Sequence, residues 1–218
     1  MISIPFGFGL GIWAAVRKNK IDDHIITLIS MIVISVPAFV YAFVLQYLLG
    51  FRFKIFPPIV APLEAGMTYF SPKLLYSYIL PVMALSFGSI AYYTRSIRAE
   101  LTENLTSEYM LLARAKGLTR AQATIRHALK NALVPMAPLV VGEVVGLLGG
   151  SLIIEKIFAI PGVGSVYLKS INNKDYDLFL FVSMFYLAIG LVAGLLGDLS
   201  YGVIDPRIRM GGGKNNAL

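Results

Sequence analysis

The chain has 218 residues, of which 57% are hydrophobic and only 14% charged, and its mean hydropathy is +0.73. The apolar residues form long uninterrupted runs rather than amphipathic patterns, which argues against a soluble core and in favour of a bilayer. The net charge of +7 lies mostly in short loops beside these runs, where membrane topology explains it better than nucleic-acid binding, and the absence of cysteine excludes disulfides and thiolate sites.

Five apolar runs are candidate transmembrane helices: residues 1–16, 25–49, 74–93, 134–154 and 178–204. A hydrocarbon layer of ~30 Å needs ~20 apolar residues at ~1.5 Å each. The first run would rise only ~24 Å, so the chain is expected to begin inside an element that normally starts earlier. The sequence therefore predicts an all-α, polytopic transmembrane helical bundle with about five spans.

The runs define one transmembrane domain, residues 1–210, followed by a glycine-rich tail, 211–218, that is expected to be flexible. Of the 19 Lys and Arg residues, 13 fall on one side of the spans and six on the other, namely Arg52, Lys54, Lys73, Lys156, Lys169 and Lys174. Because cytoplasmic loops carry the excess of cations, the loop 95–133 and the C-terminus are predicted to be cytoplasmic. The loops 50–73 and 155–177 are then extracytoplasmic.

The cytoplasmic loop is predicted to contain two short helices joined at a glycine. In the first helix, apolar residues recur near helical spacing at Ile97, Leu101, Leu105, Leu112 and Ala115. Gly117 stands where a helix end needs left-handed dihedral angles.

The second helix is predicted to begin at a capping box formed by Thr119 and Gln122. It would present Ala121, Ile125, Ala128 and Ala132 on one side, with cations around the rest. Two interpretations of the loop remain open. It is either a charged connector that fixes topology and touches anionic headgroups, or a docking helix whose alanines allow close approach of a partner protein.

Glu143 lies near the middle of the run 134–154, where an unpaired charge costs ~2.5 to 3.5 kcal/mol on insertion scales. It is either a pathway residue that meets the amino group of a peptide or a protonated carboxyl bonded to a neighbouring helix. Glycines at 142, 146 and 150, and at 190 and 194, have small-xxx-small spacing, which predicts helix-packing faces. The loop 155–177 is apolar at its start but broken by Pro161, Gly162 and Gly164, so it is expected to dip back into the membrane.

Three ordered segments resemble the permease subunits of ABC importers, in the branch that transports oligopeptides, dipeptides and nickel. The segment 112–117 with 126–135 is similar to the cytoplasmic EAA loop of these permeases. Residues 155–164 and 205–209 are similar to two further family segments. One departure is clear, because Leu111 and Leu112 stand where the generic pattern has Glu and Ala.

The resemblance implies a type I ABC importer permease in a bacterial inner membrane, with its EAA loop docked as a coupling helix on a cytoplasmic ATPase. The implied docking residues are Ala113, Arg114, Ala115, Lys116, Gly117 and Leu118. It further implies an extracytoplasmic loop motif, Glu155, Phe158, Pro161, Gly162 and Gly164, and a C-terminal motif, Asp205, Pro206 and Arg207. The implied partners are a second permease subunit, two ATPase subunits that bind ATP and magnesium, and an extracytoplasmic substrate-binding protein, in addition to membrane lipid and without nucleic acid.

Other classes of function find less support in the sequence. His24 and His127 are isolated, and no nucleophile elbow, HExxH segment or Walker loop occurs, so no enzyme activity, metal site or cofactor is expected in this chain. The alternative is a secondary transporter or channel that works without an ATPase, for which internal repeats or several intramembrane charges would be expected. The motifs do not separate oligopeptide, dipeptide, nickel or signalling-peptide cargo.

Overall fold

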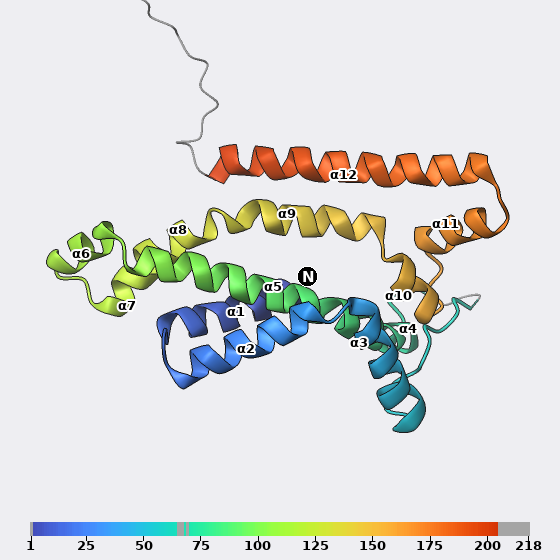
Figure 1. The fold of residues 1–218 in the computed structure, drawn as a ribbon, viewed down its shortest axis with the longest axis horizontal. Helices are drawn as coiled ribbons and strands as arrows, with labels where there is room; N and C mark the ends of the chain where they lie inside the picture. Colours follow the sequence, from blue (N-terminus) through green and yellow to red (C-terminus); the bar gives the residue numbers. More distant parts are fainter. Residues whose placement is uncertain (1, 65–67, 69, 205–218) are drawn as a thin grey trace, which may run out of the picture. The chain divides into compact units, whose positions relative to one another are not determined.

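The computed structural model describes residues 2–64, 68 and 70–204, and every regular element within these ranges is a helix (Figure 1). Three of them are not α-helical: η1 and η2 are π-helical, and η3 is a 3₁₀ turn. In chain order the elements are α1 Ser3–Val16, α2 Ile21–Ser35, α3 Ala38–Leu45, η1 Gln46–Arg52, α4 Pro72–Ser77, α5 Ile79–Leu105, α6 Glu108–Ala115, α7 Arg120–Ala123, η2 Thr124–Ala128, α8 Leu129–Leu133, α9 Met136–Gly146, η3 Leu147–Gly149, α10 Leu152–Ile157, α11 Val163–Asn172 and α12 Tyr176–Ile204.

The helices fall into two compact units. The first unit joins the chain up to Arg98 with Gly149–Leu187, and the second joins Ala99–Leu148 with the chain from Ala188 onward. Two long helices, α5 and α12, belong partly to each unit.

One helix of the described chain, Tyr176–Ser200, is long and apolar enough to cross a bilayer alone. Two more candidates are bent pairs, Ile21–Ser35 with Ala38–Arg52 at 94° and Arg120–Leu133 with Met136–Gly149 at 52°. The first bend falls inside the predicted run 25–49, and the second lies at the start of the predicted run 134–154.

Prolines stand at both bends. Pro37 has no N–H to donate and forces Val36 out of the helical region, to φ −94° and ψ 125°. Pro135 also lacks an N–H to donate, but Val134 before it keeps helical angles, at φ −57° and ψ −55°. The predicted count of five spans also included two helices that fail the same test of length and apolarity: α1, with 14 residues, and α5, whose second half carries charged side chains.

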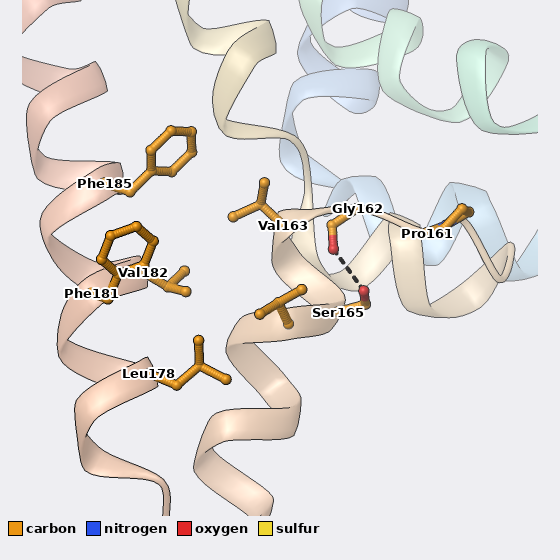
Figure 2. Close-up of a pocket in the computed structure, with 9 residues that line it drawn as sticks. Pro161, Gly162, Val163, Ser165, Leu178, Phe181, Val182 and Phe185 are labelled. Carbon is orange, nitrogen blue, oxygen red and sulfur yellow. Dashed lines mark hydrogen bonds between the residues drawn. The ribbon is translucent and has the colours of Figure 1, made fainter.

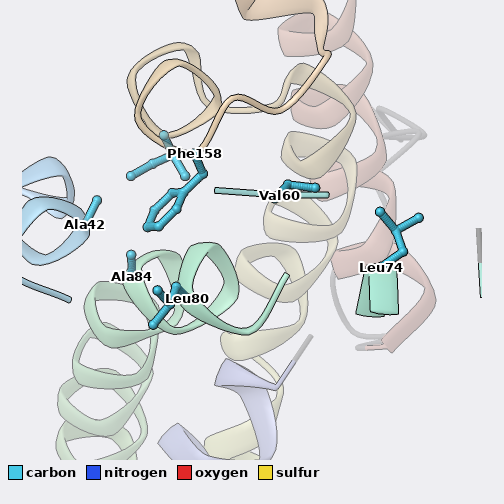
Figure 3. Packing of buried hydrophobic residues seen from close by; sticks show 7 residues of the cluster. Ala42, Val60, Leu74, Leu80, Ala84 and Phe158 are labelled. Carbon is cyan, nitrogen blue, oxygen red and sulfur yellow. The ribbon is translucent and has the colours of Figure 1, made fainter. Parts of the chain in front are cut away.

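The buried core of the first unit surrounds Phe158 (Figure 3). Its members come from α3, the loop after η1, α4, α5 and α10: Ala42, Val60, Leu74, Leu80, Ala84, Ile154 and Phe158. Segments from both predicted extracytoplasmic loops thus pack against the same helices.

Of the five glycines predicted to form packing faces, only Gly150 has a close contact within the described chain, and that contact is with the Glu155 side chain. A Cβ atom added to Gly142, Gly146, Gly190 or Gly194 would meet no atom there within 4 Å. In α1, by contrast, Gly7 and Gly11 lie close against α5.

Candidate functional site

The predicted glycine elbow of the cytoplasmic loop is present. α6 ends in a Schellman motif, in which the Leu118 amide donates to the Ala113 carbonyl at 3.3 Å and the Gly117 amide to the Arg114 carbonyl at 2.9 Å. Gly117 has φ +87°, which confirms the left-handed conformation predicted for it. Since an L-residue is strained at this angle, the sequence fixes the direction in which the chain leaves α6.

The second helix of the loop begins at the predicted capping box. The Gln122 amide donates to Thr119 Oγ1 at 3.3 Å, and the Thr119 amide donates to Gln122 Oε1 at 3.0 Å. Local hydrogen bonds therefore cap the helix on each side of the elbow, which makes the elbow stiff.

The buried faces of this loop differ from those predicted. The first helix breaks at Thr106 and Ser107, so α6 starts in a new register and buries Met110 and Ala113 while Leu112 and Ala115 are exposed. The predictions for Ile97 and Leu101 are confirmed, since both are fully buried.

In the second helix, the π-helical segment η2 widens the turn. Ala123 and Ala128, five residues apart, are buried together with Ala132, whereas Ala121 and Ile125 are exposed. α6 contacts α7 and η2, so small alanine side chains line the contact between the two arms of the elbow.

The docking residues implied by the resemblance are mostly exposed. Arg114, Ala115, Lys116 and Gly117 are exposed, Leu118 is half-buried, and Ala113 is buried against the rest of the loop. The sequence interpretation missed three large apolar side chains that stand out of the same loop. Leu111, Leu112 and Ile125 are 69%, 57% and 63% exposed. The departure from the generic pattern at 111 and 112 was the available signal.

In the loop motif predicted to be extracytoplasmic, the backbone of glycine residues encloses the carboxylate of Glu155. This side chain is buried, and its oxygens accept hydrogen bonds from the Ser151 and Ser165 amides, each at 3.2 Å. A Cβ added at Gly162 would lie 2.5 Å from Glu155 Cδ, and one at Gly150 would lie 2.1 Å from Glu155 Oε1. The motif glycines are thus required by the volume of the carboxylate and by the close approach of α11 to α10.

Phe158 and Gln46 connect the two loops to the helices of the first unit. The Phe158 carbonyl accepts the Val60 amide at 2.9 Å, and Phe158 itself is fully buried. The Gln46 amide group donates to the carbonyls of Pro58 and Ile157, both at 2.8 Å. Gln46 was not predicted, although a lone amide side chain in an apolar run was a usable signal.

Pro161, Gly162 and the first turns of α11 line an apolar groove of about 560 Å³ against α12 (Figure 2). The α12 side chains that face it are Leu178, Phe181, Val182 and Phe185. The Ser165 hydroxyl, at the edge of the groove, donates to the Gly162 carbonyl at 2.6 Å.

In the loop 50–73, the hydrogen bond from the Lys73 ammonium at 2.8 Å lowers the pKa of the exposed Glu64 carboxyl.

The remaining predicted residues are placed as follows. Glu143 lies in α9 and is half-buried. The motif Asp205, Pro206 and Arg207, like the tail 211–218, lies outside the described residues.

The helices and loops define a multi-pass, all-helical membrane protein. The chain belongs to the family described as binding-protein-dependent transport system inner membrane component, whose model matches residues 7–210. This match confirms the resemblance carried by the three motifs.

Curated relatives cover nearly all of this chain. It is 40% identical over 210 residues to the dipeptide transport system permease protein DppB of Lactococcus lactis and 36% identical to that of Bacillus subtilis, in each case over 96% of this chain. It is 33% identical over 94% of its length to the oligopeptide transport system permease protein OppB of Mycobacterium bovis. The chain spans 65 to 66% of the length of these relatives.

Proposed function

We propose that this chain is the permease subunit of an ATP-driven importer and forms half of a pathway for dipeptides or oligopeptides. The relatives' names, which specify dipeptide and oligopeptide transport, support this cargo class. An extracytoplasmic binding protein delivers the peptide, and a second permease subunit completes the pathway. Two ATPase subunits on the cytoplasmic side bind ATP and Mg²⁺, while this chain holds no cofactor and is not an enzyme.

The observation that carries this proposal is the exposed apolar surface on the cation-rich elbow. Leu111 and Leu112 project from α6 beside Arg114 and Lys116, in a loop that the distribution of cations assigns to the cytoplasm together with the C-terminus. Large apolar side chains in a polar, water-facing segment are typical of a surface that another protein covers. A topology-fixing connector would need only the cations.

The elbow also has the stiffness that coupling requires. Its two arms are joined by the Schellman motif and the capping box, and they pack through alanines. A docked ATPase that moves this elbow therefore moves its two arms together, as a rigid body. At the opposite side, the Glu155 motif and the loop 50–73 form the mouth that receives the peptide, and Glu143 lines the pathway.

The test is co-purification with the ATPase subunits, followed by uptake of radiolabelled dialanine and tetra-alanine into proteoliposomes. Replacing both Leu111 and Leu112 by serine removes apolar contact area worth ~1.5 to 3 kcal/mol per side chain, so ATPase binding should weaken by about tenfold or more. Replacement of both by methionine keeps the area and is the matched control. Uptake that needs no ATP, or a serine variant that binds the ATPase as tightly as the wild type, would contradict the proposal.

A further inference from the structure

A buried carboxylate near the start of α2 accepts hydrogen bonds from two other segments of the first unit. Asp23 is fully buried, and Arg98 in α5 binds it in a two-pronged manner, through Nε to Oδ1 and through Nη2 to Oδ2 at 2.8 Å. The backbone amide of Asn19, in the turn between α1 and α2, donates to the same Oδ2 at 2.9 Å. Asn19 has φ +64°, so this bond also holds a left-handed turn residue in place.

The same stretch of α5 is in close contact with α1. A Cβ added to Gly11 would lie 2.1 Å from Ile97 Cγ2, and one added to Gly7 would lie 2.6 Å from Tyr93 Cβ. The Thr94 hydroxyl approaches the Gly7 carbonyl at 3.2 Å. Because α1 also contacts α2, the hairpin of these two helices is held to residues 93–98 of α5 on two sides.

The neighbouring Asp22 has a different environment. It accepts from Trp13 Nε1 and lies 3.3 Å from Arg17 Nη1, in an exposed pair on the outside of the turn. Exposed pairs contribute little to stability, so Asp22 provides a matched comparison for Asp23.

Arg98 occupies a special position along the chain. It is the last residue of α5 in the first unit, and the helix continues without a break to Leu105, directly before the elbow described above. A continuous helix transmits displacement along its axis and rotation about it. Any movement of the elbow that travels along α5 into the first unit therefore reaches Arg98 before the other residues of that unit.

We propose that Asp23 and Arg98 are positioning residues that make the α1–α2 hairpin follow α5 when the elbow moves. This inference rests on the proposed function, because it assigns a part to these residues in coupling ATP hydrolysis to transport. Separating the pair would leave a carboxylate buried without its countercharge, which is far more unfavourable than separating apolar surfaces that slide. The pair thus forbids slippage between hairpin and α5, whereas apolar packing alone would permit it.

The experiment uses the full chain assembled with its partner subunits in proteoliposomes, with radiolabelled dialanine as the probe. The measured quantity is the number of dialanine molecules imported per ATP hydrolysed, together with KM for both substrates. Asp23→Asn keeps the shape but removes the charge, Arg98→Lys keeps the charge but loses the two-pronged geometry, and Asp22→Asn is the control.

Asp23→Asn should lower the import-to-hydrolysis ratio by roughly twofold to thirtyfold, Arg98→Lys should lower it less, and neither should change KM. Asp22→Asn should match the wild type. A purely structural role predicts less assembled complex with a normal ratio, and that result would overturn the inference. Where Asp23→Asn fails to assemble, the ratio for Arg98→Lys decides in the same way.

The two proposals fail differently. If the wild-type complex imports dialanine with ATP but Asp23→Asn and Asp22→Asn behave alike, the inference is wrong and the proposed function stands. If the wild-type complex imports neither dialanine nor tetra-alanine, the proposed function falls and takes the inference with it.

Discussion

At the scale of single residues, one carboxylate explains why several glycines occur in the motif 155–164. Gly162 has contacts at 2.5 to 2.8 Å only with the Glu155 side chain, when a Cβ is added to it. A Cβ added to Gly164 meets the backbone of α10 first, with Leu152 Cα at 2.6 Å, and Glu155 Oε2 at 2.8 Å. The two glycines are required for different reasons, and this difference can be measured.

Gly162→Ala should destabilise the protein by about 1 to 3 kcal/mol, because the new methyl group overlaps the Glu155 carboxylate. In a Glu155→Ala background that overlap is gone, so the same substitution should be nearly neutral. Gly164→Ala should stay costly in both backgrounds, because its new methyl group still meets the Leu152 backbone when the Glu155 carboxylate is gone. The stability of each variant is measured as the heat-induced loss of the folded, detergent-solubilised protein. An effect of Gly162→Ala that is the same in the Glu155→Ala background as in the wild type would contradict this account.

Some residues of the site could be predicted from sequence because their reasons are local. Gly117 and the pair Thr119 and Gln122 are defined by helix-end chemistry within a few residues, and the structure has them as predicted. The partners of Gln46, Asp23 and Arg98 could not be predicted, since they lie 12 to 111 residues away in the case of Gln46 and 75 residues away for the Asp23–Arg98 pair. A period or a spacing in the sequence contains no information about such contacts.

At the scale of elements, apolar runs predicted the presence of helices better than their shape. The run 25–49 contains both α2 and α3, but Pro37 separates them by a sharp bend. The face predicted for the second arm is present only in part. A regular period of 3.6 residues places Ala121 and Ile125 on the same side as Ala128 and Ala132, whereas with the π-helical segment η2 the last two are buried together with Ala123 and the first two are exposed. Nothing in the composition of residues 124–128 signals that wider turn.

The elbow makes the element-scale prediction. Gly117→Val should cost about 1 to 2 kcal/mol, since a β-branched residue is strained at φ +87° although a Cβ there would meet no described atom within 4 Å. The strain should redirect the chain after α6, so that ATP-driven uptake falls while membrane insertion is kept. Gly117→Asn is the control, because asparagine tolerates left-handed angles.

The readout is uptake of dialanine per inserted molecule, with insertion measured by carbonate-resistant membrane association. A Gly117→Val variant that transports as well as Gly117→Asn would show that the elbow angle has no part in coupling.

At the scale of the whole molecule, the distribution of charge predicts the orientation of the chain in the membrane, which helix geometry does not. The all-α class followed from composition, because a chain with this hydropathy can satisfy its backbone inside a bilayer with helices. The number of spans did not follow from composition. In the described chain, one single helix and two bent helix pairs are long and apolar enough to be candidate spans. The predicted orientation depends on neither helix length nor apolarity, since it rests on the excess of cations in the loop that contains α6 to α8 and in the sequence after α12.

The absence of cysteine from the sequence allows this orientation to be tested directly. Lys116, beside the elbow, and Lys169, in α11, are both exposed, so a single cysteine at either position is open to a water-soluble maleimide that does not cross membranes. In right-side-out vesicles Lys169→Cys should react and Lys116→Cys should not, and inside-out vesicles should reverse the two. Detergent should make both reactive, which controls for burial by a partner. Labelling of Lys116→Cys from outside would place the Leu111–Leu112 surface beyond the reach of a cytoplasmic ATPase. No ATP-driven movement could then enter through α5. The roles proposed for the elbow and for the Asp23–Arg98 pair would both be wrong.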